Sequence, residues 1–358
     1  MLQVFNTKEE YNNFIENDPI LKSGILYYIK EDNSGHFATN NIEDEYKIYD
    51  LGREASILKN LISRQITDIT IPDGVTNIGQ YAFADCFGLT NITIPNTITN
   101  IGYCAFEGCT SLTSITIPEG VTMLSNGVFK GCYNLSNITL PNSLNLISDD
   151  TFEGCTSLPT ENNLRYADTI LIGVVDKTLS TYTIKEGTKW IGPYAFKDCT
   201  NLTSITIPDS VTKIDSGAFE GCTSLTSITI PSSVTKIDGS VMFKNCTSLP
   251  NATFENNITK IGVNMFENCT SLTSITIPSS VTSLGTNIFA NCSSLSSIRA
   301  LKTTAPSVKY TTFKDIKRNG TLTVPKGSGS SYNKWMKDPY SGDTEYYLQY
   351  YGWTKVEG

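Results

Sequence analysis

Apolar and polar residues alternate in short stretches that return along most of the chain. The copy that begins at Leu112 reads LTSITIPEGVTMLSNGVFKGCYN, and close copies begin at Leu202 and Leu272. In the first copy, Ile115 and Ile117 alternate with polar residues. Alternation with a period of two is typical of a half-buried β-strand. Each copy therefore predicts one strand with an apolar inner face and a polar outer face.

The rest of each copy is equally regular. A proline follows the strand in most copies, as at Pro118, and we expect it to end the strand without removing a donor from the ladder of hydrogen bonds. A shorter Val-Thr-x-Ile stretch comes next, followed by a turn that contains one phenylalanine. The recurring cysteines are Cys86, Cys109, Cys132, Cys155, Cys199, Cys222, Cys246, Cys269 and Cys292, with steps of 23, 23, 23, 44, 23, 24, 23 and 23 residues. A fixed period in this range predicts a solenoid, in which stacked units close one continuous core.

The repeated pattern Leu-x-x-Ile-x-Ile-Pro-x-x-Val-Thr-x-Ile-Gly-x-x-Ala-Phe-x-x-Cys closely resembles the BspA-like leucine-rich repeat family, also called the Treponema pallidum type. The resemblance implies a leucine-rich repeat solenoid over residues 66–320, mostly β and right-handed, with phenylalanine-containing turns. It also implies a C-terminal cap at 321–358. The residues Thr321–Pro325 themselves predict a last strand. Known members are mainly surface or secreted proteins. The resemblance therefore implies adhesion, or binding of a protein or glycan outside the cell, and it supplies no catalytic residues.

Residues before the repeat predict a small α+β N-terminal module at 1–52 and a capping helix at 53–65. Thr7 and Glu10 have the spacing of a capping box, and Gly24–Ile29 has the composition of a strand. The opening stretch MLQVFNTKEEYNNF has no basic region followed by an apolar core, so we do not expect a secretory signal there.

One interval between cysteines is 44 rather than 23 residues, which predicts an insertion at 159–182. Two apolar stretches, Ile170–Val175 and Leu179–Ile184, flank the polar run Asp176–Thr178 and predict a β-hairpin. We interpret the insertion as a structural variant of the coil rather than as a dedicated binding loop. A second departure is Glu255, which stands where other copies have proline.

Composition narrows the class of partner. The chain has 358 residues, of which 17% are charged, and a net charge of −8. No cluster of lysine and arginine stands out in the sequence, so we expect neither a nucleic-acid partner nor an anionic membrane surface. The sequence has no run of about 18 apolar residues, so we also expect no membrane insertion.

Cysteine and histidine give no sign of catalysis or metal binding. The single histidine, His36, lies outside the repeat, and a Ser-His-Asp or Cys-His arrangement would have to use it. The sequence has no Cys-x-x-Cys pair and no histidine cluster, so we predict no zinc site, no other metal and no cofactor. A pair of carboxylates, as in glycosidases, stays open as an alternative. We predict that the chain is not an enzyme.

The recurring cysteines are better explained as packing residues. Since they share one repeat position, we expect them to be buried free thiols that pack as small apolar side chains. Cys104 stands at a different position of the repeat. We expect its thiol to be only partly packed and to react first with a thiol reagent.

The polar outer face of the predicted sheet is the candidate binding surface. Threonine recurs at one position, and serine, asparagine or threonine recurs two residues earlier. The candidate residues are Ser114, Thr116, Asn137, Thr139, Thr183, Ser204, Thr206, Ser227, Thr229, Thr253 and Thr276. Threonine is also common on exposed strands, so these rows are either solvated strand positions or a hydroxyl and amide surface that meets a ligand.

Together, these observations predict a non-enzymatic binding or adhesion protein whose repeat surface contacts a protein or glycan outside the cell. The family resemblance carries the prediction of a cell-surface or extracellular location. The alternative is a structural or receptor-binding protein of a phage virion, attached through the module at 1–52. That alternative rests on the missing secretory signal and on the non-repeat N-terminus.

Overall fold

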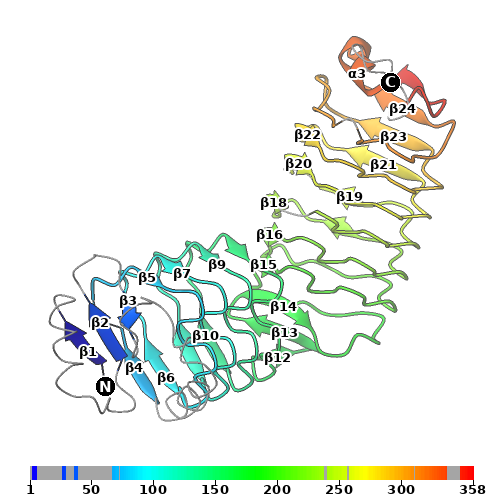
Figure 1. Ribbon diagram of the computed structural model, residues 1–358. Helices are drawn as coiled ribbons and strands as arrows, with labels where there is room; N and C mark the ends of the chain where they lie inside the picture. The colour runs from blue at the N-terminus through cyan, green and yellow to red at the C-terminus, as the bar shows by residue number, and fades with distance from the viewer. Residues whose placement is uncertain are drawn as a thin grey trace, which may run out of the picture. The chain divides into compact units, whose positions relative to one another are not determined.

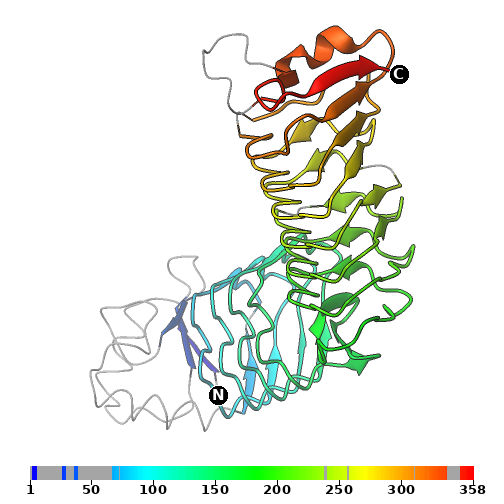
Figure 2. The same cartoon turned by 90° about the vertical axis from the view of Figure 1, so that its right-hand side faces the viewer.

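The computed structural model describes residues 2–5, 26–29, 36–38, 67–71, 73–237, 240–255, 258–309, 311–336 and 347–358. The chain forms two compact units, Met1–Pro159 (unit 1) and Thr160–Gly358 (unit 2). In each unit the repeats wind as a mostly β solenoid, and the residues that the structure describes contain very little helix (Figure 1 and Figure 2). The predicted fold class is confirmed.

The N-terminus contributes a small sheet to unit 1. Strand β1 (Leu2–Phe5) pairs in parallel with β2 (Leu26–Ile29), which pairs antiparallel with β3 (His36–Ala38). Strand β2 falls within the predicted strand Gly24–Ile29. The helix predicted at the capping box of Thr7 and the capping helix at 53–65 lie outside the described residues.

The repeats of unit 1 supply two rows of parallel strands. The strands of the main sheet are β4 (Asp68–Thr70), β6 (Asn91–Thr93), β8 (Ser114–Thr116) and β10 (Asn137–Thr139). The strands of the second sheet are β5 (Asn77–Ile78), β7 (Asn100–Ile101), β9 (Met123–Leu124) and β11 (Leu146–Ile147). The central isoleucine of each main strand is buried, as Ile115 is, and this confirms the predicted alternation.

Unit 2 repeats this arrangement. Its main sheet contains β17 (Thr229–Ile230), β19 (Thr253–Phe254), β21 (Ser274–Ile277), β23 (Ser297–Ala300), β24 (Thr321–Val324) and β25 (Thr354–Glu357). Its second sheet contains β14 (Ile170–Val174), β15 (Trp190–Ile191), β16 (Lys213–Ile214), β18 (Lys236–Ile237), β20 (Lys260–Ile261) and β22 (Ser283–Leu284). The pairs within β14–β15–β16–β18 and within β21–β23–β24–β25 are parallel, as a solenoid requires.

Stacked phenylalanines form the centre of each core. In unit 2, the ring of Phe219 lies between those of Phe196 and Phe243, with centroids 5.3 and 5.7 Å apart and nearly parallel planes. The stacked rings of unit 1 are Phe83, Phe106, Phe129 and Phe152. A single coil could not bury such a ring, so stacking supplies the burial that holds adjacent coils together.

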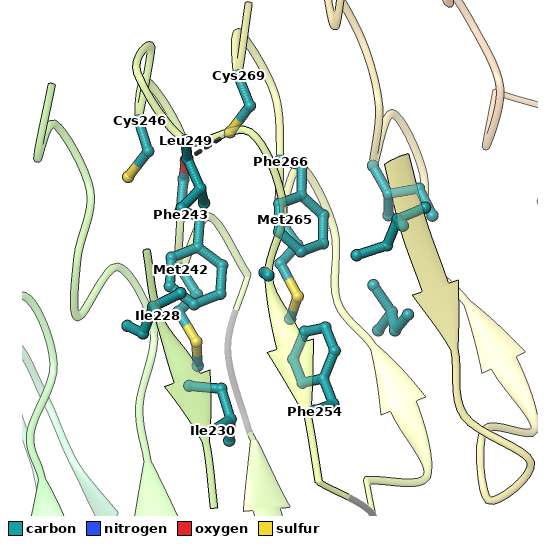
Figure 3. Close-up of a cluster of buried hydrophobic side chains, with 14 of the residues drawn as sticks. Ile228, Ile230, Met242, Phe243, Cys246, Leu249, Phe254, Met265, Phe266 and Cys269 are labelled. Atoms are coloured by element: carbon teal, nitrogen blue, oxygen red, sulfur yellow. Dashed lines mark hydrogen bonds between the residues drawn. The ribbon is translucent and has the colours of Figure 1, made fainter. Parts of the chain in front are cut away.

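The recurring cysteines link one coil to the next. All ten cysteines of the chain are free and buried, which confirms the prediction for the repeat thiols. Each thiol after the first coil of a unit lies near the backbone of the preceding coil, and Cys269 Sγ donates a hydrogen bond to the carbonyl oxygen of Phe243 at 3.0 Å (Figure 3). Cys222 and Cys246 make the same bond to Phe196 and Phe219. The cysteine therefore acts as a packing residue and as a weak donor.

Cys104 is also buried, which corrects the expectation of a partly packed thiol. Only 2% of the residue is exposed. Its thiol occupies the space beside Gly127 of the next coil, where an ideal Cβ would lie 2.6 Å from Cys104 Sγ. Because that neighbour is a glycine, the coil closes over the sulfur. Burial raises the pKa of the Cys104 thiol to about 11, which further reduces its reactivity.

The insertion forms a hairpin, but with strands other than the predicted pair. Strand β12 (Thr160–Glu161) turns into β13 (Leu164–Ala167) through Asn162 and Asn163, whose φ angles of +51° and +65° fit a two-residue hairpin turn. Strand β13 then pairs antiparallel with β14, whose range Ile170–Val174 agrees with the first predicted strand.

The second predicted strand of that hairpin, Leu179–Ile184, belongs to the main sheet. Thr183 pairs in parallel with Thr206 of the following coil. The intervening polar run is a turn, because Asp176 Oδ1 accepts hydrogen bonds from the backbone N–H and the hydroxyl of Thr178. The predicted turn at Asp176–Thr178 is therefore confirmed, but it joins two sheets rather than two strands of one hairpin.

The repeat proline does remove a ladder donor, contrary to the prediction. Glu255 stands at the proline position of its copy, and its N–H donates to Ile230 O at 3.0 Å. Leu301, also at that position, donates to Ile277 O at 3.0 Å. The ladder thus continues through this position wherever an N–H is available, and a proline there forgoes one hydrogen bond.

A row of charged residues follows the phenylalanines, with the sign of charge alternating from coil to coil. In unit 2, Lys197 Nζ lies 3.8 Å from a carboxylate oxygen of Glu220, and Lys244 Nζ lies 2.8 Å from one of Glu267. In unit 1 the same position carries Glu107, Lys130 and Glu153, with 2.6 Å between the last two charges. Each such partly exposed pair contributes less than about 1 kcal/mol.

The C-terminal segment covers the end of the stack. After β24 come the 3-10 helix η1 (Gly329–Tyr332) and the short helix α3 (Asn333–Met336). Trp335 is fully buried, packs on Phe313 at 5.4 Å between ring centroids, and donates a hydrogen bond from Nε1 to Pro306 O. The strand predicted at Thr321–Pro325 is β24, but it is not the last strand as predicted, because β25 follows it in the chain and pairs with it in parallel.

Candidate binding surface

The outward face of the main sheet in unit 1 gathers four of the candidate residues. Asn137 lies opposite Ser114, and Thr139 lies opposite Thr116, in the parallel pair of β10 and β8. Asn137, Thr139 and Thr116 are exposed, and Ser114 is half-buried. Parallel pairing therefore aligns side chains of the same kind across coils instead of scattering them.

The main sheet of unit 2 aligns the other seven candidates. Thr183 pairs with Thr206, Ser204 with Ser227, and Thr229 with Thr253, all in parallel. These six side chains and Thr276 are exposed. The structure therefore places all seven sequence-predicted residues of this unit on one polar face.

The hydroxyls of the candidate rows are free of protein partners. Within the part of the chain that the structure describes, none of the eleven candidate side chains makes a hydrogen bond to another protein group. The neighbouring row behaves differently, because the hydroxyls of Thr203, Thr226 and Thr273 each donate to a backbone carbonyl of the preceding coil. Sequence alone does not separate these two classes of threonine. The adjacent row stabilises the stack, while the candidate rows remain available to a ligand.

In unit 2 the two candidate rows carry no charge until their C-terminal end. In the described strands from Thr183 to Thr276, the two rows carry hydroxyl and amide side chains. Arg299 then takes the threonine position opposite Thr276, with Thr323 on its other side. This exposed arginine was missed by the sequence analysis because the repeat pattern decays after Leu295.

The described residues hold neither a cluster for a metal ion nor a helix that could span a membrane. In those ranges, no group of three or more histidine, cysteine, aspartate or glutamate residues is placed to hold a metal ion. The same part of the chain has no helix long and apolar enough to cross a bilayer. His36 lies on β3, and its side chain is outside the description.

The family model of the BspA type leucine rich repeat region matches residues 59–167 and 175–327, in six copies. The residues skipped between these ranges lie within the insertion at 159–182. No curated protein matches the chain. The comparisons lend no support to the phage alternative.

Solved structures of bacterial leucine-rich repeat proteins are similar to this chain. One from Eubacterium ventriosum is 25% identical, with 80% of this chain and 86% of that chain covered and a TM-score of 0.42. One from Bacteroides ovatus is 21% identical, with 94% and 99% covered and a TM-score of 0.36. A leucine rich cell surface protein from Faecalibacterium prausnitzii is 24% identical, with 92% and 91% covered and a TM-score of 0.31.

Proposed function

The chain belongs to the BspA-type leucine-rich repeat family, and on that premise we propose that it is a non-enzymatic binding protein. Its ligand is a protein or glycan met outside the cell, and its contact surface is the outward face of the main sheet. One observation carries the proposal. The candidate residues are exposed, apart from the half-buried Ser114, aligned across coils and free of protein hydrogen-bond partners, whereas the neighbouring threonine row is bonded to the backbone.

The physical argument concerns desolvation. A hydroxyl already bonded to its own backbone would have to break that bond to serve a ligand, while a free hydroxyl exchanges only water. A single such bond contributes about 1 kcal/mol, so recognition needs several on one face. Unit 2 repeats the same pair of polar positions on one face from coil to coil.

The proposal is tested by an array of glycans and extracellular-matrix proteins probed with the purified chain. A double variant, Thr206→Lys with Thr229→Lys, places two bulky charges in the middle of the face. The matched control, Thr235→Lys with Thr259→Lys, changes exposed threonines beside the second sheet of the same unit. We expect the first pair to abolish binding of the array ligand and the control pair to retain it. Equal binding by both pairs would refute the proposed surface.

A further inference from the structure

The main-sheet face of unit 2 repeats one chemistry once per coil. Its threonine row consists of Thr183, Thr206, Thr229, Thr253 and Thr276. Adjacent strands lie about 4.8 Å apart, so the row presents one hydroxyl and one methyl group at that interval. The second row, two residues earlier, lies roughly 6.6 Å away along the strand direction. The face is therefore a lattice with two unequal repeats.

A ligand that contacts more than two of these side chains has to run across the strands. Each strand exposes only two candidate positions, because the residue between them is buried, as Ile205 and Ile228 are. Equivalent groups recur from coil to coil and not along a strand. The ligand that uses the whole row is thus a chain with a repeat of its own, close to the strand spacing.

The chemistry of the rows narrows this ligand further. Hydroxyl and amide groups both donate and accept hydrogen bonds, which suits a partner covered in hydroxyls. From Thr183 to Thr276, the described residues of the two rows include no lysine or arginine to attract an anionic polymer. The same rows include no tryptophan, tyrosine or arginine, the side chains that dominate hot spots between proteins.

We propose that this face binds an extended, neutral polysaccharide that lies along the row of coils, with one sugar to each coil. The proposal rests on the binding function proposed above and narrows its ligand class. An extended β-linked sugar chain advances per sugar by a distance near the strand spacing, so successive sugars meet equivalent side chains. The free hydroxyls bind sugar hydroxyls, and the threonine methyl groups contact the apolar faces of the rings. Arg299 ends the row, and it thereby sets the length of chain that the face accommodates.

The first test measures dependence on ligand length. The full chain is titrated calorimetrically with cello-oligosaccharides of about two to eight sugars and is also pulled down on insoluble cellulose, chitin and mannan. We expect affinity to rise at least about tenfold with length and to level off near about five sugars. Added salt changes the affinity little, because the sugar chain is neutral and the two rows from Thr183 to Thr276 carry no charge. Failure to bind any of these neutral polymers overturns the inference.

Matched variants locate the contact. Thr206→Val with Thr229→Val removes two free hydroxyls while keeping the side-chain shape, and it weakens binding at least about tenfold. Thr235→Val with Thr259→Val, on the other sheet, leaves binding unchanged. Melting curves establish that both pairs fold as the parent chain does. An equal effect of the two pairs overturns the inference.

The remaining outcomes separate this inference from the proposed function. Suppose that the array yields a protein or a sulfated, salt-sensitive polymer, and no neutral polysaccharide. The polysaccharide inference then fails, and the binding function stands if Thr206→Lys with Thr229→Lys abolishes that contact. If a ligand is bound and this lysine pair has no effect, both proposals fail.

Discussion

Replacing Phe219 by alanine tests whether inter-coil stacking holds this fold together. Phe219 is fully buried, and its ring lies between Phe196 at 5.3 Å and Phe243 at 5.7 Å. Removing a buried phenylalanine ring costs about 3–5 kcal/mol through lost burial and the cavity that remains. The upper part of that range applies here, because the ring contacts two coils and each aromatic pair adds about 0.5–1.5 kcal/mol beyond its area. Since a solenoid is held by nearest-neighbour interfaces, the change weakens two of them together.

The assay is urea unfolding followed by circular dichroism, with Thr206→Ala as the matched control in the same unit. Thr206 is exposed and makes no side-chain hydrogen bond within the described residues, so we expect a cost well under about 1 kcal/mol. The phenylalanine variant should show a much lower midpoint, and the threonine variant should unfold with the parent chain. If the two variants proved equally mild, the assignment of inner and outer faces would be wrong.

Three further predictions concern thiols and glycines. Burial raises the pKa of the Cys246 thiol to about 12, so above about pH 8.5 the unfolded chain loses the thiol proton while the folded chain keeps it. The free energy of unfolding should therefore fall as the pH rises above about 8.5, and chemical unfolding between about pH 7 and 10 measures this fall. Cys246→Ala should make the fall less steep, and a free energy of unfolding that does not change with pH would contradict the reasoning. Cys104 should stay unlabelled by a thiol reagent in the folded protein and should react together with the repeat thiols on unfolding. Mass spectrometry locates the label, and fast labelling of Cys104 under native conditions would argue against its burial. Gly217→Ala should destabilise the fold by more than the roughly 1–2 kcal/mol of left-handed backbone strain, because φ of Gly217 is +62° and an added Cβ would lie 2.2 Å from the Tyr194 ring. Gly187→Ala is the control, since Gly187 has φ +86° and open space around it, and it should show the backbone strain alone. Equal losses of stability in melting curves would show that the contact with Tyr194 adds nothing.

The repeat itself carries most of the fold. Alternation around Ile115 predicted a buried centre and exposed flanks, and the strand of the structure has that pattern because a period of two is the geometry of a strand. Position within the repeat was also enough to predict which face Thr206 and Thr229 occupy. What it could not supply was the hydrogen bonding of each hydroxyl, since this depends on the backbone of the preceding coil.

Errors arose where the neighbouring coil decides the outcome. The predicted hairpin was wrong because its turn lies elsewhere. Asn162 and Asn163 adopt left-handed backbone angles and form the hairpin turn, whereas the polar run after Val175 joins two sheets. Cys104 was expected to be partly packed because its own position looked variable, while its burial depends on Gly127 one coil later. Contacts of this kind span about one repeat in sequence and become visible only when the coils are stacked.

The sign of the charge beside the phenylalanines alternates from coil to coil, so removing an odd or an even number of coils brings different charges together. Deleting one coil between Lys197 and Lys244 would bring two lysines together, while deleting two coils would restore a lysine beside a glutamate, as between Lys197 and Glu267. Like charges in adjacent coils repel, so arrays shortened or lengthened by an even number of coils keep the alternation of charge and odd ones do not. Recombination within this stretch in steps of two coils therefore preserves the alternation of charge. The row of charges thus distinguishes even from odd changes in the number of coils, although its ion pairs stabilise the stack only weakly.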